Sequence, residues 1–316
     1  MANDNENFDI YDHPVLNMAN MRIQTRPMQS LHDALIRLVW TYAVGAAVIG
    51  FSRAGKSFAF ELLANKIKAR NGKPVPVVIY SVFSRDMHTI KAMYEDITDY
   101  INLPLPKRPR IPEMKAAITM YIAERAVECG VKIAVFVIDE AQRLNIKQLD
   151  VFSELHDIMK HKYGIHVIMI FVGNKDQLST LLKQIIRGEN QHLQGRFFRQ
   201  LVEFKGLSTM REVKECLDQY DTLRYTKCGP TYTEQFLPEE YSHGFRLSSL
   251  APVMWDSFRD IQKTLSIDSW GIEHFIKTTS TLLSDYLTQY GVDGDIETMI
   301  NHSMTVDELN SLIEIL

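Results

Sequence analysis

The strongest constraint on the fold is the segment from Gly50 to Ser57, which reads Gly-Phe-Ser-Arg-Ala-Gly-Lys-Ser. It contains the complete G-x-x-x-x-G-K-[ST] pattern of a phosphate-binding loop. An apolar run from Val44 to Ile49 precedes it, and an amphipathic pattern from Phe58 to Lys68 follows it. A chance match would lack this strand-loop-helix context. The segment therefore predicts an α/β fold with a nucleoside triphosphate at the loop.

The loop residues have separable roles toward a nucleoside triphosphate. Gly50 and Gly55 permit turns that direct backbone N–H groups at phosphate oxygens. Lys56 would reach the terminal phosphates as a fixed cation, and the Ser57 hydroxyl would complete the coordination of Mg²⁺. The predicted nucleotide-binding segment consists of Gly50, Phe51, Ser52, Arg53, Ala54, Gly55, Lys56, Ser57 and Phe58.

A second part of the site is predicted where the apolar stretch from Val131 to Ile138 ends in Asp139-Glu140. In phosphate-loop enzymes a carboxylate at the tip of the neighbouring strand holds Mg²⁺, and Asp139 is placed for that role. Glu140 is then the natural base to polarise a water for attack on the γ-phosphate. An isolated Asp-Glu pair would be interpreted as solvated turn residues, but this pair follows a strand and a phosphate loop.

The composition, net charge and cysteine spacing exclude several classes of protein. The chain has 316 residues, of which 46% are hydrophobic and 23% charged, as in an ordinary globular protein. Its formal net charge of −4 argues against a uniformly basic nucleic-acid coat but permits local basic patches. Cys129, Cys216 and Cys228 lack the spacing of a disulfide framework or a zinc site. With no export signal and no apolar stretch of membrane-spanning length, we expect a soluble cytoplasmic protein.

Apolar strand patterns alternate with amphipathic helices up to about residue 207, which predicts a parallel five-stranded sheet covered by helices on both faces. The strands are expected at Val44–Ile49, Val75–Phe83, Val131–Ile138, Ile165–Val172 and Leu201–Phe204. Helices are expected at Phe58–Lys68, Thr89–Ile101, Pro112–Glu128, Ile146–His161 and Gln177–Ile186.

From Thr209 the pattern is helical only, which predicts a smaller C-terminal all-helical lid. Its helices are expected at Met210–Thr222, Phe245–Leu265, Trp270–Tyr290 and Val306–Leu316, with a looser segment at Lys227–Pro238. The predicted domains are an N-terminal extension and leading helix (1–40), an α/β nucleotide-binding domain (41–207), and the lid with C-terminal helices (208–316).

Together, the phosphate loop, Asp139-Glu140, Asn174 at the end of Phe171-Val172-Gly173-Asn174 and the helical lid resemble the AAA+ ATPases over residues 13–290. Within that superfamily the chain is most similar to the TnsC/TniB transposition regulators. The narrower resemblance is carried by His13-Pro14, Arg22–Pro27, Leu31–Leu38 and Ile138-Asp139-Glu140-Ala141-Gln142-Arg143. The chain lacks the long appendages of the larger TnsC proteins, so it resembles their compact forms, including those of CRISPR-associated transposons.

The resemblance implies roles for particular residues. Asn174 would be the polar sensor that orients the attacking water, with the capping of a turn as the alternative. Arg196 or Arg199 would be an arginine finger that reaches the γ-phosphate held by a neighbouring subunit, while the other forms an ordinary salt bridge. Arg187 is a weaker candidate for this role. Arg246, in Ser242-His243-Gly244-Phe245-Arg246, would contact the nucleotide within its own subunit, unless it is a solvated arginine at a helix start.

The resemblance also implies partners. A site completed by another subunit predicts a homo-oligomer, either a ring or a helical filament, around double-stranded DNA. A transposase and a targeting subunit of the TniQ type would bind the assembly. Solvated surface charge is the alternative for each of the candidate DNA-contacting residues, which are Arg85, His88, Lys91, Lys107, Arg108 and Arg110.

Two other functions share the same nucleotide site. A helicase loader or another remodelling ATPase would bind a helicase or single-stranded DNA instead of a transposase. A signalling or defence ATPase would use the module as a switch without DNA. A small-molecule phosphotransferase fits less well, because no acceptor-binding constellation accompanies the nucleotide site.

Overall fold

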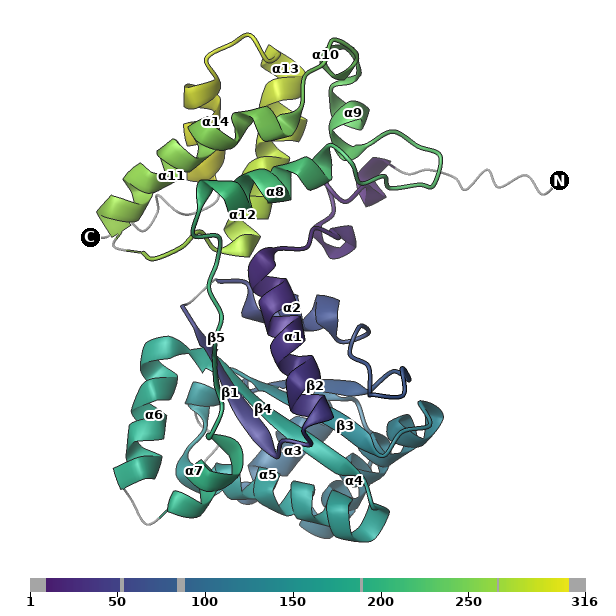
Figure 1. Ribbon diagram of the computed structural model, residues 1–316. Helices are drawn as coiled ribbons and strands as arrows, with labels where there is room; N and C mark the ends of the chain where they lie inside the picture. Colours follow the sequence, from purple (N-terminus) through teal and green to yellow (C-terminus); the bar gives the residue numbers. More distant parts are fainter. Residues whose placement is uncertain (1–9, 52–53, 84–88, 188–189, 266, 307–316) are drawn as a thin grey trace, which may run out of the picture. The chain divides into compact units, whose positions relative to one another are not determined.

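The computed structural model describes residues 10–51, 54–83, 89–187, 190–265 and 267–306 (Figure 1). The chain divides into two compact units. The sheet unit comprises residues 28–52 and 56–204, and the helical unit comprises residues 1–27, 53–55 and 205–316. The last break between the units along the chain falls after Phe204. The predicted domain limits at residues 40 and 207 stay a prediction.

The sheet unit contains the expected five-stranded parallel sheet. Its strands are β1 (Gly45–Gly50), β2 (Val77–Ser81), β3 (Ile133–Asp139), β4 (His166–Asn174) and β5 (Leu201–Glu203). They lie in the order β2-β3-β4-β1-β5, and every neighbouring pair is parallel. All residues of β1 and β3 are buried, as expected of strands covered on both faces.

The strand order corrects one expectation. The strand that ends in Asp139 does not neighbour the phosphate-loop strand, because β4 lies between β3 and β1. The carboxyl ends of all the strands still meet at one edge of the parallel sheet, and residues that follow different strands can converge there.

Helices cover both faces of the sheet (Figure 1). They are α1 (Arg26–Trp40), α2 (Lys56–Leu63), α3 (Ile90–Tyr100), α4 (Ile111–Glu128), α5 (Ile146–Ile158), α6 (Lys175–Arg187) and α7 (Gln191–Phe197). A π-helical turn, Met159–Tyr163, continues α5, and a 3-10 turn, Ala141–Arg143, follows β3. On one face, residues of α3, α4 and α5 form a continuous core with the sheet. On the other, Leu35 of α1 and Phe60 of α2 lie near Val77 and Val135.

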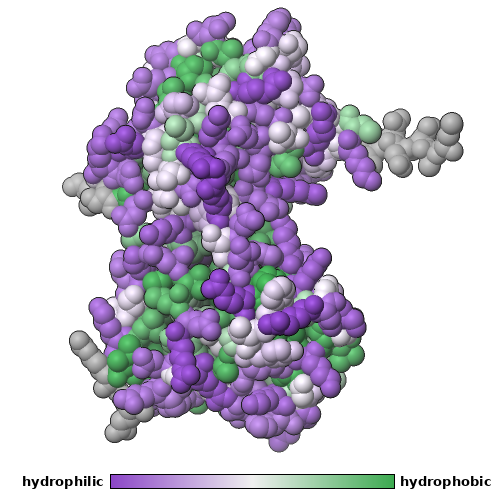
Figure 2. Space-filling view, in the orientation of Figure 1, coloured by the Kyte–Doolittle hydropathy of each residue, from purple (hydrophilic) through white to green (hydrophobic). Residues whose placement is uncertain are grey.

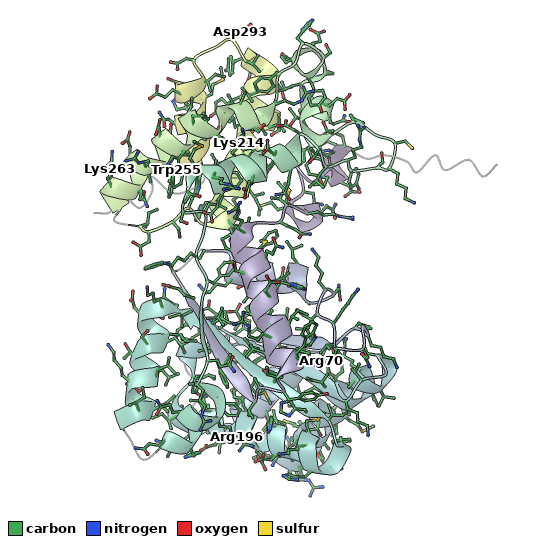
Figure 3. All side chains as sticks on the ribbon, viewed as in Figure 1. Arg70, Arg196, Lys214, Trp255, Lys263 and Asp293 are labelled. Atoms are coloured by element: carbon green, nitrogen blue, oxygen red, sulfur yellow. The ribbon has the colours of Figure 1, made fainter. Side chains whose placement is uncertain are left out.

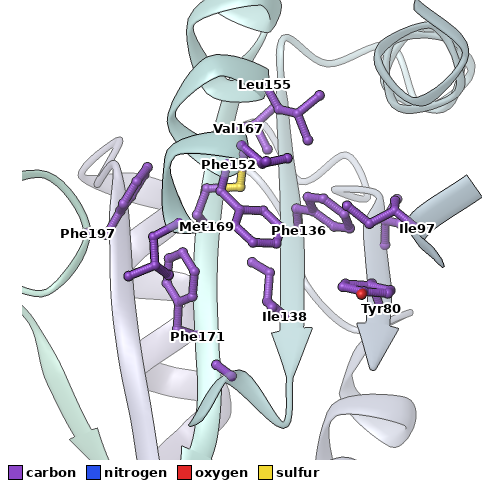
Figure 4. Close-up of a cluster of buried hydrophobic side chains, with 14 of the residues drawn as sticks. Tyr80, Ile97, Phe136, Ile138, Phe152, Leu155, Val167, Met169, Phe171 and Phe197 are labelled. Atoms are coloured by element: carbon purple, nitrogen blue, oxygen red, sulfur yellow. The ribbon is translucent and has the colours of Figure 1, made fainter. Parts of the chain in front are cut away.

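Aromatic side chains form the centre of the larger core (Figure 4). Phe171 of β4 packs against Phe152 of α5 and Phe197 of α7, with ring centroids 5.6 and 5.4 Å apart. All three side chains are fully buried. Phe171 therefore holds two helices on the strand that carries Asn174.

Replacing Phe171 with alanine is expected to destabilise the protein by about 3–5 kcal/mol, because it removes buried apolar area and leaves a cavity. Urea denaturation should show a lower midpoint with an unchanged slope. Phe83→Ala is the control, since the Phe83 side chain is exposed and its loss should change stability by about 0.5 kcal/mol or less. Similar midpoints for the two variants would contradict the assignment of Phe171 to the core.

The helical unit is built from short helices. They are α8 (Met210–Tyr220), α9 (Tyr232–Phe236), α10 (Pro238–Ser242), α11 (Ala251–Leu265), α12 (Ile272–Thr281), α13 (Thr288–Tyr290) and α14 (Ile296–Val306). A 3-10 turn, Leu247–Leu250, precedes α11, and a π-helical turn, Leu282–Leu287, joins α12 to α13. Two further 3-10 turns, Ile10–Asp12 and Met18–Asn20, lie near the N-terminus.

Three expectations for this unit need correction. The segment 227–238 contains α9, which begins at a capping box formed by Thr231 and Glu234. The pattern from Phe245 to Leu265 is not one helix, because Asp221 accepts the backbone N–H groups of Leu247 and Ser248 and fixes a 3-10 turn before α11. Helix α14 was not predicted. The expected Val306–Leu316 helix lies outside the described residues except at Val306, where α14 ends.

None of the helices that the structure describes combines the length and apolar character that crossing a lipid bilayer would require.

Candidate nucleotide site

The phosphate loop joins β1 to α2 and requires glycine at two positions. A Cβ on Gly50 would lie 2.3 Å from the backbone oxygen of Phe204, so a side chain cannot be accommodated there. Gly55 has φ +91°, in the left-handed region that favours glycine. Gly50 therefore ends the strand where a neighbouring backbone passes, and Gly55 turns the chain into α2. Ser52 and Arg53 lie outside the described residues.

Lys56 lies folded over the loop. Its Nζ donates to the carbonyl oxygens of Gly50 at 3.1 Å and Phe51 at 2.6 Å. Burial lowers the pKa of Lys56 below its ordinary value, and the carboxylates of Asp139 and Glu140 partly oppose this shift. A bound anion would favour the charged ammonium further. The Lys56 ammonium is thus a partly desolvated cation beside the carbonyls of the loop, where it is expected to bind phosphate.

Ser57 and Asp139 meet at the carboxyl edge of the sheet. Ser57 Oγ donates to Asp139 Oδ2 at 2.5 Å, although 82 residues separate them and β4 lies between their strands. Asp139 is 6% exposed, and its Oδ1 accepts the backbone N–H of Glu140 at 2.8 Å. The sequence-predicted pair is therefore brought together.

The donor set fits Mg²⁺. A hydroxyl and a carboxylate oxygen are hard ligands, and Mg²⁺ is typically held by one or two such groups together with phosphate oxygens and water. Among the described residues, no group of three or more His, Cys, Asp and Glu side chains could form an all-protein metal site. Ser57 and Asp139 are the side chains that would hold the ion.

Glu140 has an unusual backbone and a constrained carboxylate. It adopts φ +56° and ψ 32°, a left-handed conformation that is uncommon for residues other than glycine. Its Oε2 accepts a hydrogen bond from Gln142 Nε2 at 2.9 Å and lies 3.2 Å from a guanidinium nitrogen of Arg143. Such strained conformations cluster at functional sites, because the surrounding contacts must hold them in place. The observation supports Glu140 as a positioned base.

Gln142 is a site residue that the sequence prediction missed. Its Nε2 contacts Glu140, while its Oε1 accepts the backbone N–H of Asn174 at 3.2 Å. One amide side chain thus connects the predicted base to the end of β4. The only signal in the sequence was its place in the Ile138–Arg143 signature, which the resemblance used without assigning Gln142 a role.

Arg143 is the second missed residue. Its guanidinium donates to the backbone oxygens of Val82 at 2.7 Å and Phe83 at 3.0 Å. These residues follow β2, so Arg143 ties the end of that strand to the turn that carries Glu140.

Asn174 performs the alternative role considered for it. Its Oδ1 accepts the backbone N–H groups of Asp176 at 3.0 Å and Gln177 at 3.5 Å, in the first turn of α6. The side chain therefore caps that helix. Its function as a sensor of the γ-phosphate stays a prediction.

The two arginines of the predicted finger segment differ. Arg196 forms an ion pair with Asp157 of α5, and its guanidinium lies 5.6 Å from the ring centroid of Phe197 (Figure 3). Arg199 follows α7, is exposed, and forms no ion pair with the described carboxylates. Arg196 thus matches the ordinary salt bridge of the prediction, which leaves Arg199 as the candidate for action on a neighbouring subunit. The side chain of Arg187 lies outside the described part.

Arg246, in the helical unit, contacts its own neighbours in the chain. Its NH1 donates to the backbone oxygens of Tyr241 at 3.0 Å and Phe245 at 2.6 Å. The guanidinium also lies 3.7 Å from the centroid of the Tyr241 ring. Its contact with a nucleotide stays a prediction.

The candidate DNA residues fall into three groups. Lys107 and Arg108 are exposed in the loop before α4. Lys91 is paired with Glu95 at 3.0 Å, and Arg110 is paired with Glu113 at 3.1 Å. The Glu113 carboxylate also accepts the backbone N–H of Arg110 at 2.9 Å, at the start of α4. Arg85 and His88 lie outside the described residues. The structure therefore leaves Lys107 and Arg108 as the members of this set without a described carboxylate partner.

Comparison with known proteins supports the fold. Residues 43–182 match the protein family described as the AAA domain. The chain is similar to the ORC2 protein of Aeropyrum pernix in its ADPNP-ADP complexes, with a TM-score of 0.51, 14% identity, and 93% of this chain and 71% of that chain covered. It is also similar to a Walker-type ATPase of Pyrococcus abyssi, with a TM-score of 0.51 and 14% identity. That match covers 93% of this chain and 77% of the other.

Drosophila ORC bound to DNA gives a TM-score of 0.50 at 13% identity, covering 86% of this chain and 62% of that chain. No curated protein sequence gave a significant match. Identities this low show a shared fold alone. Residues 43–182 thus match the AAA domain family, and the chain has the P-loop fold of the AAA+ ATPases.

Proposed function

We propose that this protein is an ATP-dependent, DNA-binding regulator of transposition, which assembles on duplex DNA and links a targeting complex to a transposase. The observation that carries the nucleotide part is the contact of Ser57 with Asp139 at 2.5 Å, with Glu140 held beside it by Gln142. The sequence signature from Ile138 to Arg143 supports the transposition part.

In the proposed reaction, each residue has a limited task. Lys56 binds the phosphates, and Ser57 and Asp139 hold Mg²⁺, which neutralises phosphate charge when bound. Glu140 accepts a proton from the attacking water, and Gln142 fixes the orientation of its carboxylate. A guanidinium from a neighbouring subunit would supply a further cation at the γ-phosphate.

Exposed apolar side chains close to Arg199 in the chain support assembly through the part of the sheet unit that carries this arginine. Leu201 of β5 and Ile186 of α6 are exposed apolar side chains on the same unit. Figure 2 shows apolar residues, in green, reaching the surface of the sheet unit. β5 is an edge strand of the sheet. A head-to-tail contact through such a face is heterologous and generates a ring or a helical filament.

Arg199→Ala is expected to lower the ATP hydrolysis rate of the assembled protein by about 10³-fold or more, because an arginine finger stabilises transition-state charge to that extent. Nucleotide affinity of the isolated subunit should stay unchanged. Arg196→Ala is the matched comparison, and it should lower thermal stability through loss of the Asp157 pair. Phosphate release and melting curves of both variants check this, and the reverse pattern would assign the finger to Arg196.

Duplex DNA would be contacted through phosphates by the exposed side chains of Lys107 and Arg108. Lys91, together with Arg85 and His88 outside the described residues, belongs to the same proposed set. In the same proposal, the protein is cytoplasmic, and its assembly binds a transposase and a targeting subunit of the TniQ type. ATP hydrolysis would disassemble the complex. A slow hydrolysis rate is therefore compatible with this function, because it sets the lifetime of the assembly.

The experiment is electron microscopy and size-exclusion chromatography of the full chain with ATP, Mg²⁺ and duplex DNA. Regular ring-shaped or filamentous assemblies that need both ATP and DNA are the expected result. Assembly that needs ATP alone would favour the signalling switch. Assembly on single strands, or capture of a replicative helicase instead of the transposase, would favour the loader.

A further inference from the structure

A second basic surface lies at the opposite edge of the sheet from the nucleotide site. The strands are parallel, so the residues that precede them meet at the amino edge. Tyr42 precedes β1, Lys73 precedes β2 and Lys132 precedes β3. We define the amino-edge surface as Trp40, Tyr42, Lys66, Lys68, Arg70, Lys73 and Lys132, all exposed and all in the sheet unit.

Hydrogen bonds and a cation–π contact connect Trp40, Lys68 and Arg70 of this surface. Trp40 Nε1 donates to the backbone oxygen of Lys68 at 3.2 Å, and Arg70 Nε donates to the backbone oxygen of Trp40 at 3.2 Å. The Arg70 guanidinium lies 5.5 Å from the Trp40 ring centroid. Figure 3 shows Arg70 beside the C-terminal end of α1. Lys73 Nζ reaches the oxygen of Gly130 at 3.2 Å, just before Lys132.

The cations of this surface form no ion pairs with the described carboxylates. The sequence from Leu62 to Arg85 contains no Asp or Glu, although the whole chain has a formal net charge of −4. None of the five cations is ion-paired with a described carboxylate, whereas Lys91, Lys115 and Lys263 all are. The nearby acid Asp33 lies 3.5 Å from His32. Concentrated positive charge of this kind attracts a polyanion.

Two exposed aromatic rings distinguish this surface from a generic basic patch. Tyr42 is 59% exposed and Trp40 is 43% exposed. Tyr42 has φ +51° at the end of α1, where glycine or asparagine is the usual residue. The Tyr42 ring lies edge-on to the His166 ring, with centroids 5.6 Å apart. Since 59% of the residue is still exposed, part of the ring is accessible for stacking with a ligand.

We propose that the amino-edge surface binds single-stranded nucleic acid, with the lysines and Arg70 along the phosphates and with Trp40 and Tyr42 stacking on bases. Cationic side chains combined with exposed aromatic rings are the arrangement that recognises single strands. Bases in a duplex are already stacked, so a duplex could use only the charges. This goes beyond the proposed function, because the site is separate from the nucleotide loop and needs neither ATP nor assembly.

The test measures fluorescence anisotropy of the full chain without nucleotide, using a labelled dT oligonucleotide of about 20 residues. A matched duplex and polyglutamate are the comparison ligands. Tyr42→Gly is the decisive variant, because glycine suits the left-handed backbone at that position and this gain offsets the lost contact with the His166 ring, so the melting temperature should stay close to that of the wild type. Its affinity for the single strand should fall about 5- to 150-fold, as the loss of one stacked base predicts.

The double variant Lys66→Gln, Lys68→Gln should bind the single strand with a weaker salt dependence. The slope of log affinity against log salt concentration, measured between about 50 and 200 mM, should be smaller in magnitude by about 1.4. Matched controls are Lys214→Gln with Lys263→Gln for charge, and Tyr290→Ala for an aromatic residue of the same 59% exposure. These controls should bind as the wild type does. Unchanged binding by Tyr42→Gly, or equal affinity for the duplex or polyglutamate, would overturn the proposal.

Discussion

Lys56→Ala is expected to abolish ATP-dependent assembly. Its ammonium lies at the phosphate loop, and a hydrogen bond to a charged group contributes about 1.5–3 kcal/mol, so ATP affinity should fall at least 10-fold. Because assembly requires bound nucleotide in the proposed mechanism, the loss is amplified at every interface. Size-exclusion chromatography with ATP, Mg²⁺ and duplex DNA should show only unassembled protein.

A thermal shift separates loss of binding from loss of folding. ATP at 100 times its dissociation constant should stabilise the wild type by about 2.7 kcal/mol, and Lys56→Ala much less. Without nucleotide, the variant should melt close to the wild type, since it loses only contacts to two loop carbonyls. Lys263→Ala, an exposed lysine of the helical unit, is the control. Normal assembly of Lys56→Ala would refute the nucleotide-driven mechanism.

Glu140→Gln is expected to lower ATP hydrolysis by about 10²- to 10⁴-fold while leaving ATP binding intact, because an amide cannot accept the proton from water. The substitution preserves shape, and an amide oxygen can still accept the hydrogen bond from Gln142. The left-handed backbone is no more strained for glutamine than for glutamate. Assemblies formed with ATP should therefore persist after the free nucleotide is diluted.

Phosphate release measures the expected loss of hydrolysis by Glu140→Gln. The lifetime of the assemblies after dilution measures their expected persistence. Glu124→Gln makes the same chemical change on the exposed face of α4 and should leave both quantities unchanged. Rapid disassembly of Glu140→Gln at the wild-type rate would show that hydrolysis is not the step that ends the assembly.

The sequence alone determined the local parts of this protein. The pattern from Gly50 to Ser57 specified strand, loop and helix, because glycine spacing and apolar runs act on residues adjacent in the chain. The buried run before Asp139 likewise specified a strand and its polar end. The five-stranded parallel sheet followed from the alternation of such runs with amphipathic helices, and both the structure and the AAA domain match confirm it.

Tertiary structure decided which of these parts meet. Only the sheet order places β4 between β1, the strand that leads to Ser57, and β3, which ends at Asp139. Only packing pairs Arg196 with Asp157, 39 residues away, and leaves Arg199 exposed. The link from Glu140 through Gln142 to Asn174 depends on two strand ends lying side by side. Periodicity describes one element at a time, whereas these contacts are fixed by burying several elements against each other, so no local pattern contains them.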